Sequence, residues 1–391
     1  MPVFEPFRAL RYAAAELDRL VAPPYDVLSD ADTDALTARS PHNIVRVDVP
    51  RGGEDRYQAA AAELSRWRAD GVLVQDPRPS FTIYRMSFDD ESGQPRQIAG
   101  VLGGLQVVDE GARGVLPHER TTPKASTDRL DLTRATRCNL SPVWGLSLAR
   151  GLTEALQEPG LLVGQVEDQG VAHRVERVDD PERVASIRAV VGADDVLIAD
   201  GHHRYGISRV YRDEIRTATG RTDTPAEQTL TFVNELVPEQ LSVAAIHRLY
   251  AGISFDAVRE ALSASFLLEP TSRPTPGTLA EMQVDGVLVL TDGTRSDRLR
   301  PRPAAFAGLR ALDGLWLETA LQGLAAEVNY QHGLGEVLAA VDSGRASAAV
   351  LIRPVSVAEI ERTAREGLLM PPKSTFFMPK LKTGFVLRPL D

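Results

Sequence analysis

The spacing of apolar residues predicts a series of strands and helices along the first part of the chain. Residues 43–49 alternate apolar and polar side chains, a pattern typical of a half-buried strand. Residues 56–70 follow as a helix. Residues 81–88 and 97–108 predict a hairpin, because turn-forming residues join two apolar runs. The glycines within residues 100–104 lie inside the second hairpin strand, so we expect them to serve packing.

The same pattern continues through the middle of the chain and then changes near residue 250. Residues 151–195 predict a helix, a strand and a helix, and further strands are expected at 230–233 and 243–246. We expect an α+β protein with a mixed-sheet core over residues 1–250. A smaller α+β unit covers residues 251–391, and its predicted elements are helices at 255–264 and 315–327 and strands at 286–291 and 348–352.

One strand leads into a turn that carries unusual chemistry. Val196–Ala199 is a run of four apolar residues, and Asp200-Gly201 after it is a turn signal. A helical spacing begins at Tyr205, so the turn holds His202, His203 and Arg204. A helix start offers N–H groups and a positive dipole end, which suit a phosphate. Asp200 at the strand tip is a candidate to hold a metal ion or accept a proton.

Two further polar segments carry candidate site residues. The segment between Leu116 and Leu130 mixes cations, a carboxylate and hydroxyls without a clear period, which fits phosphate and metal handling; its candidates are His118, Glu119, Arg120 and Lys124. The segment 370–384 combines prolines, Phe376-Phe377 and lysines. A disordered tail would not carry such aromatic residues, so we expect it to fold back onto the core. Its candidates are Lys373 and Ser374.

If these three groups converge, they provide cations for phosphates, carboxylates for Mg²⁺ or proton transfer, and N–H groups at a helix start. Phosphoryl transfer requires those parts, since its catalysis consists largely of positioning and charge neutralisation. The same residues permit metal-dependent hydrolysis, with His118, His202, His203 and Asp200 as ligands. Arg204 beside them favours an anion, so phosphoryl transfer ranks first. No P-loop, kinase signature or Rossmann glycine pattern is present.

Composition narrows the class of protein. The 391 residues are 43% hydrophobic and 25% charged, as in ordinary globular proteins, and the net charge is −10. No block of Lys and Arg supplies a nucleic-acid surface. Cys138 is the single cysteine, which excludes an internal disulfide and a multi-cysteine metal site. No apolar run approaches the roughly 20 residues of a membrane helix, and the N-terminus lacks a signal-peptide pattern, so we expect a cytoplasmic protein.

An ordered set of motifs identifies the chain as similar to a known family. The motifs are Pro6-Phe7-Arg8, Ala22-Pro23-Pro24-Tyr25-Asp26-Val27, Asn43-Ile44-Val45-Arg46-Val47-Asp48, His118-Glu119-Arg120-Thr121, Asp128-Arg129-Leu130, Asn139-Leu140-Ser141-Pro142, Asp200-Gly201-His202-His203-Arg204-Tyr205, His247-Arg248 and Met370-Pro371-Pro372-Lys373-Ser374-Thr375. Together they resemble the domain-of-unknown-function 1015 family over nearly the whole chain. That family looks related to free-serine kinases with a ParB/sulfiredoxin-like fold, which share the Asp-Gly-His-His-Arg motif.

The resemblance implies a kinase that transfers phosphate from ATP, with Mg²⁺, to the hydroxyl of a free metabolite, L-serine first, giving O-phosphoserine. Asp200 or Glu119 would then serve the metal or the acceptor hydroxyl. The residues implied for nucleotide binding are Gly201, Arg204, His118, Arg120, Lys124, Lys373 and Ser374, and those for catalysis are Glu119, Asp200, His202 and His203. The alternatives are a non-catalytic nucleotide-binding regulatory module and a metal-dependent phosphohydrolase. The acceptor, the choice among ATP, ADP and CTP, the base and the oligomeric state stay open.

Overall fold

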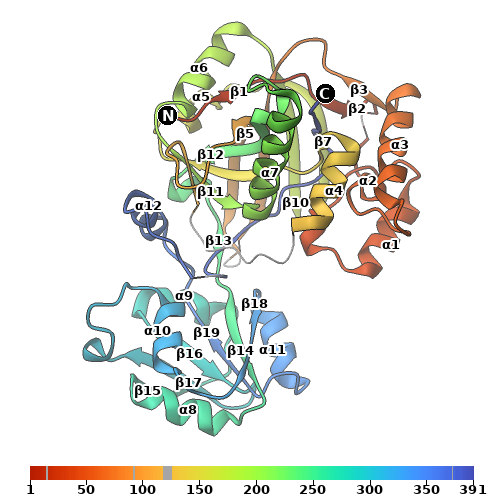
Figure 1. Ribbon diagram of the computed structural model, residues 1–391. Coiled ribbons are helices and arrows are strands. Elements are labelled where there is room, and N and C mark those ends of the chain that lie inside the picture. Colours follow the sequence, from red (N-terminus) through yellow and green to blue (C-terminus); the bar gives the residue numbers. More distant parts are fainter. Residues whose placement is uncertain (15, 91–92, 118–125, 372) are drawn as a thin grey trace.

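Two β-sheets organise the chain. The computed structural model describes all residues except 15, 91–92, 118–125 and 372. A larger sheet is built from strands between residues 4 and 235, and a smaller sheet from strands between residues 247 and 351. Figure 1 shows the two sheets in separate bodies, with the smaller one below the larger and strand β13 (Val243–Ala244) between them.

The larger sheet is mixed. Within the described ranges it has nine strands in the order β6-β11-β8-β12-β5-β4-β10-β9, with β1 paired to β5. β6 runs parallel to β11 and β8 parallel to β12, whereas the other pairs are antiparallel. The mixed sheet predicted from the sequence is confirmed. Its strands are β1 Phe4–Glu5, β4 Phe81–Asp89, β5 Pro95–Gln106, β6 Val115–Pro117, β8 Val143–Ser147, β9 Leu161–Asp168, β10 Val171–Val178, β11 Val196–Asp200 and β12 Gln228–Glu235.

The smaller sheet is antiparallel, with the strand order β15-β17-β16-β19-β14-β18. Its strands are β14 His247–Ala251, β15 Phe266–Thr271, β16 Leu288–Thr291, β17 Ser296–Pro301, β18 Glu327–Gln331 and β19 Ala348–Leu351. Short two-stranded pairs complete the topology: β2 Leu10–Tyr12 with β3 Leu73–Gln75, β7 Cys138–Asn139 with β21 Arg388–Pro389, and β13 Val243–Ala244 with β20 Phe376–Phe377.

Helices accompany both sheets. Those before residue 247 are α1 Asp30–Arg39, α2 Val45–Asp48, α3 Arg56–Ala69, α4 Ser126–Thr136, α5 Leu152–Ala155, α6 Pro181–Val191 and α7 His202–Thr219. Those after it are α8 Phe255–Ser263, α9 Pro276–Asp285, α10 Asp313–Ala320, α11 Leu334–Asp342 and α12 Val357–Arg365. None of the helices in the described part of the chain is long and apolar enough to span a membrane.

The core lies on both faces of the larger sheet. Along β4, Phe81 and Ile83 join one hydrophobic cluster, while Tyr84 and Met86 join another on the opposite face. Side chains alternate between the faces of a strand, so helices on both sides bury them. The hairpin predicted for residues 81–108 is confirmed as β4 and β5.

The glycines of β5 pack closely against aromatic rings, as expected. A Cβ at Gly100 would lie 2.3 Å from the Phe232 ring, and one at Gly103 would lie 2.4 Å from the Phe4 ring. Any side chain at these two positions would displace a ring of the core.

The strand predicted at residues 43–49 is wrong, because Val45–Asp48 forms the short helix α2. The Asn43 side-chain oxygen accepts a hydrogen bond from the Val45 N–H at 3.0 Å, and Asp48 N–H bonds to Ile44 O at 2.9 Å. Val45 and Val47 are both fully buried. Apolar residues two positions apart can thus be buried by a single turn of helix, which the alternation alone does not distinguish from a strand.

Three other predicted elements differ in extent. Residues 151–195 contain two strands, β9 and β10, where one was expected. The helix predicted at 315–327 ends at Ala320, ahead of Gly323 in the left-handed region. The strand predicted at 243–246 is only the two residues of β13, and His247 begins the next strand, β14.

The chain returns from the smaller sheet to the larger one. Ile360 and Ala364 of α12 belong to the same hydrophobic cluster as Trp144 of the larger sheet. Met370 and Phe377 join that cluster, and β20 pairs with β13. The last residues of the chain therefore lie against the core that its first half forms.

Candidate functional site

The Asp-Gly-His-His-Arg motif forms the strand–turn–helix unit expected from the sequence. Asp200 ends β11, Gly201 makes the turn, and His202 begins α7. Gly201 has φ +84°, a left-handed conformation that side chains rarely adopt, and a Cβ there would lie 2.9 Å from Arg204 Nε. The turn therefore requires glycine. The first turn of a helix offers N–H donors and the positive end of the helix dipole to a ligand.

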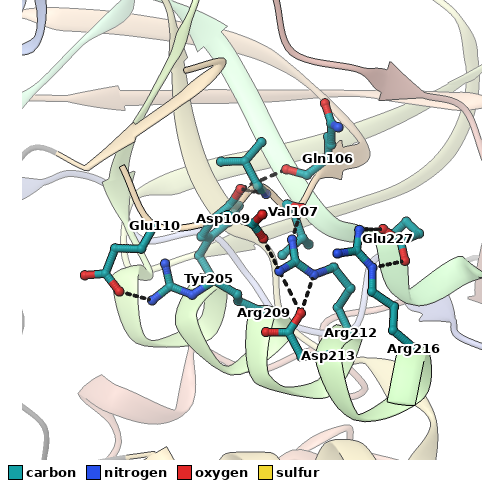
Figure 2. A network of polar contacts seen from close by, with 11 residues as sticks. Gln106, Val107, Asp109, Glu110, Tyr205, Arg209, Arg212, Asp213, Arg216 and Glu227 are labelled. Carbon is teal, nitrogen blue, oxygen red and sulfur yellow. Dashed lines mark hydrogen bonds and ion pairs between the residues drawn. The ribbon is translucent and has the colours of Figure 1, made fainter. Parts of the chain in front are cut away.

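Polar contacts from the arginines of α7 fix the helix to the end of β5 (Figure 2). Arg212 is buried and donates hydrogen bonds to Val107 O and, at 2.6 Å, to Asp109. Tyr205 Oη donates to Gln106 O at 2.9 Å. Since these contacts begin only three residues after His202, they also fix where the helix N-terminus points.

Asp200 is held between two cations. Lys380 Nζ lies 3.1 Å from Asp200 Oδ2, and Arg204 Nη2 lies 3.4 Å from the same oxygen. Burial pushes the pKa of the Asp200 carboxyl upward, but the charges of Lys380 and Arg204 outweigh burial and hold that pKa below its ordinary value. Asp200 is therefore a stable anion and a weak base.

Arg204 packs against the turn and joins three segments of the chain. It donates a hydrogen bond to Pro142 O, and its Nη2 lies 3.9 Å from Asp26 as well as near Asp200. Burial lowers the pKa of Arg204, yet Asp200 and Asp26 raise it by more, so the guanidinium remains charged. Its Nε is buried and has no hydrogen-bond partner among the described residues, which leaves one donor for a ligand or a water.

A second charged cluster adjoins Arg204. The Arg129 guanidinium lies 4.1 Å from the centre of the Tyr25 ring and 3.2 Å from Asp48. Burial raises the pKa of Asp48, against the charges of Arg129 and Arg204. A cavity of about 40 Å³ separates the two arginines. That volume suits a water molecule or a small ion.

A larger cavity, called the site cavity below, is lined by Lys380, the ion-pair partner of Asp200. Its volume is about 400 Å³, and Lys380, Lys382, Phe376 and His332 line it together with residues of α1 and the β9–β10 turn. Lys380 Nζ lies 4.2 Å from the centre of the Phe376 ring, and His332 stacks on that ring at 4.1 Å. Lys380 thus links the anion at the helix start to the wall of a cavity of small-molecule size.

The structure gathers some of the site residues predicted from the sequence and not others. Asp200, Gly201, His202, His203 and Arg204 are consecutive around the turn. Lys373 is exposed, with φ +61°, and Ser374 Oγ donates to Pro371 O at 2.7 Å, so neither lines the site cavity. His118, Glu119, Arg120 and Lys124 lie outside the described residues. Strand β6, which precedes them, runs parallel to β11, and Pro117 is paired with Ile198.

Sequence reasoning did not select Asp26, Asp48, Arg129 or Lys380 as site residues. The first three residues stand in the motifs that carry the family resemblance, so their place in those motifs was the signal that could have identified them. Lys380 follows the last of those motifs by a few residues. In the described part of the chain, no group of three His, Cys, Asp or Glu side chains is arranged to hold a metal ion.

Comparisons with solved structures give distant likenesses. A free serine kinase in complex with AMP is 12% identical, with a TM-score of 0.36, and the match covers 70% of this chain and 89% of that one. SbnI with a C-terminal truncation, from Staphylococcus aureus, is 13% identical, with a TM-score of 0.40 and coverage of 74% and 87%. A conserved hypothetical protein from Pyrococcus furiosus is 13% identical, with a TM-score of 0.38 and coverage of 70% and 92%.

No curated protein matches the chain. The family model described as "Protein of unknown function (DUF1015)" matches residues 4–315, a span that contains every motif of the resemblance except the C-terminal one. The chain therefore belongs to the DUF1015 family.

Proposed function

We propose that this protein is an ATP-dependent phosphotransferase that phosphorylates the hydroxyl of a free metabolite, with L-serine as the first acceptor and O-phosphoserine as the product. One observation carries the proposal. Asp200 and Arg204 stand at the N-terminus of α7, and Lys380 connects them to the site cavity. A helix start, two cations and a carboxylate beside a cavity are the groups that phosphoryl transfer needs.

Phosphate binding is proposed for the helix start and its cations. Arg204 has a buried Nε donor without a partner among the described residues, and Lys380 reaches the site cavity. A phosphate there would receive N–H groups of the first turn of α7 and the charge of Lys380. Gly201, which has no Cβ, leaves room for the Arg204 guanidinium against the turn. His118, Arg120, Lys124, Lys373 and Ser374 retain the nucleotide-binding roles proposed from the sequence.

Mg²⁺ is proposed to bind at Asp200 and Asp26, or at Asp200 and Glu119. Asp26 and Asp200 approach the same nitrogen of Arg204, at 3.9 Å and 3.4 Å, so the two carboxylates converge. One or two carboxylates together with phosphate oxygens and waters are a common magnesium ligand set. When bound, the ion would neutralise charge on the transferred phosphate.

The base that takes the hydroxyl proton is proposed to be another group than Asp200, since a carboxylate with a lowered pKa is a poor proton acceptor. Asp26, which is partly exposed beside Arg204, is proposed for that role in the arrangement where Glu119 and not Asp26 shares the Mg²⁺ with Asp200. Glu119, His202 and His203 retain the catalytic roles proposed from the sequence.

A free amino acid suits the charges of the site cavity. Its lining includes Lys380 and Asp32 together with the ion pair of Lys382 and Asp168. A zwitterion such as serine would present its carboxylate to a lysine of this lining and its ammonium group to an aspartate. We also propose that the core has a ParB/sulfiredoxin-like fold. The boundary between the two units is proposed to lie near residue 250.

An acceptor panel tests the proposal. ADP formation from ATP and Mg²⁺ is measured with serine, threonine, homoserine, glycerol and no acceptor. We expect ADP formation to depend on serine. Equal ADP formation with every acceptor and with none would instead show a phosphohydrolase. Nucleotide binding without ADP formation would show a regulatory module.

A further inference from the structure

A second cavity lies between the two sheets, and we call it the inter-sheet cavity. Its volume is about 550 Å³, within the range of small-molecule sites. One side is formed by the end of β4, the β9–β10 turn and the segment 241–245, and the other by α9, Ile352 and Pro354. Both bodies of the protein thus contribute to it, and ligand sites often lie at such junctions.

The inter-sheet cavity adjoins the site cavity. Gln169, Val171, Met378 and Pro379 line both cavities, and Lys380 follows Pro379 directly in the chain. A molecule that occupied both would therefore pass beside Met378 and Pro379. Its two ends would meet different surroundings.

The lining of the inter-sheet cavity is mostly apolar, with a few neutral polar groups. Leu241, Val243, Leu279 and Met378 supply apolar surface, and Gln169 and Gln283 supply amides. The charged residues of the lining include Asp90 and Arg96, which form an ion pair with a distance of 3.0 Å. Most of this surface offers a ligand dispersion contacts and neutral hydrogen bonds.

His247 adds a buried, neutral ring to this lining. Its Nδ1 accepts a hydrogen bond from the Ile352 N–H at 3.1 Å. Burial, with the charge of Arg248, lowers the pKa of His247 to about 4, so the ring is neutral near pH 7. A neutral imidazole that accepts at Nδ1 carries its proton on Nε2. The apolar lining, the neutral amides and the neutral imidazole therefore suit an uncharged ring with polar atoms on its edge.

We propose that the inter-sheet cavity binds the purine ring of the nucleotide, while the phosphates lie past Met378 and Pro379 at Lys380 and the N-terminus of α7. This inference rests on the proposed function, because it assigns the two ends of the ATP that the phosphotransferase would use. The ring is then held by both sheets, so nucleotide binding fixes the two bodies relative to each other.

The test separates the ring from the phosphates. Ala280 lines the inter-sheet cavity from α9 and is exposed to it, so Ala280→Trp fills the space without displacing a buried core residue. Val284 lies on the same helix, is 86% exposed and does not line the cavity, so Val284→Trp is the matched control. Lys380→Ala removes a cation at the phosphate end. Adenosine, inorganic triphosphate and ATP are titrated into each variant by calorimetry.

We expect Ala280→Trp to weaken adenosine and ATP binding by about tenfold or more and to leave triphosphate binding unchanged. Lys380→Ala should weaken triphosphate and ATP binding but not adenosine binding. Val284→Trp should bind all three ligands as the wild type does. Thermal unfolding of each variant shows whether it is folded.

Two results would overturn the inference: adenosine binding that is absent or that Ala280→Trp leaves unchanged, and ATP binding that this variant leaves unchanged although adenosine binding is lost. The second result would mean that the cavity takes a separate molecule. Failure of the proposed function is recognised differently, by the absence of triphosphate binding and of serine-dependent ADP formation in the wild type.

Discussion

Lys380 Nζ lies 3.1 Å from Asp200 Oδ2, although 180 residues separate the two in the chain. The contact joins the C-terminal segment to the strand–turn–helix motif and makes one wall of the site cavity part of the charged cluster at the helix start. Asp200 needs this second cation, because burial without charge compensation would raise its pKa. The C-terminal segment is therefore part of the site and not only a packed tail.

Lys380→Ala should reduce phosphate transfer strongly. The variant removes one of the two cations on Asp200 and the amine that faces the site cavity, so we expect kcat/KM for ATP to fall by about a hundredfold. Steady-state ADP formation measures the effect. Arg345→Ala, which removes an exposed cation in the smaller body, serves as the control and should behave as the wild type. Similar activity of the two variants would exclude Lys380 from the site.

Arg204→Ala should cost both activity and stability. The substitution leaves Asp200 with one cation and removes the donor to Pro142 O. Breaking such a buried pair costs about 3–5 kcal/mol of the free energy of unfolding. Urea unfolding and ADP formation measure the two effects. Arg204→Lys keeps the charge but lacks the forked geometry, so it should recover part of the stability and little of the transfer rate. Full recovery of the rate by lysine would contradict a requirement for that geometry.

Gly201→Ala should be more damaging than Gly220→Ala, although both glycines flank α7 in the left-handed region. The conformational cost of alanine is about 1–2 kcal/mol at either position. At Gly201 the added Cβ also lies 2.9 Å from Arg204 Nε, whereas nothing lies within 4 Å at Gly220. We expect Gly201→Ala to weaken ATP binding and Gly220→Ala to leave it unchanged. Equal ATP affinities would show that the turn does not position Arg204 for the ligand.

Two buried histidines should make the protein less stable in mild acid. Burial, together with Lys382 near His173 and Arg248 near His247, lowers the pKa of each ring to about 4, from 6.5. Below pH 6.5 the unfolded chain takes up protons that the folded protein does not. The free energy of unfolding should therefore fall between pH 6.5 and 4, by up to about 3 kcal/mol for each histidine. Urea unfolding at several pH values measures the slope, which His173→Gln should reduce. An unchanged slope in that variant would show that His173 is not the source.

The sequence predicted the local parts of the site and missed the long-range ones. The run Val196–Ala199 and the helical spacing after Tyr205 determine β11 and α7 through neighbouring residues, so the pattern was sufficient there. Lys380 and Asp26 reach the site only through tertiary packing, which no periodicity encodes. Residues 118–125 lie outside the described part of the chain, so the roles predicted for them stay predictions.

The wrong strand at residues 43–49 has a similar cause. Its apolar residues do face the core, as the alternation indicated, but the Asn43 side chain accepts a hydrogen bond from the Val45 N–H at the start of a helical turn. A hydrogen bond that a backbone N–H donates to the side chain two residues earlier favours the helical turn over a strand that would bury the same residues. Neither the composition nor the spacing of apolar residues predicts such a hydrogen bond.

Phosphorus NMR of the protein with ATP, Mg²⁺ and L-serine, against the same sample without serine, tests the proposed phosphotransferase most directly. We predict a new phosphomonoester signal and the signals of ADP only when serine is present. ADP and inorganic phosphate in both samples, or ATP that stays unchanged in both, would contradict a serine kinase.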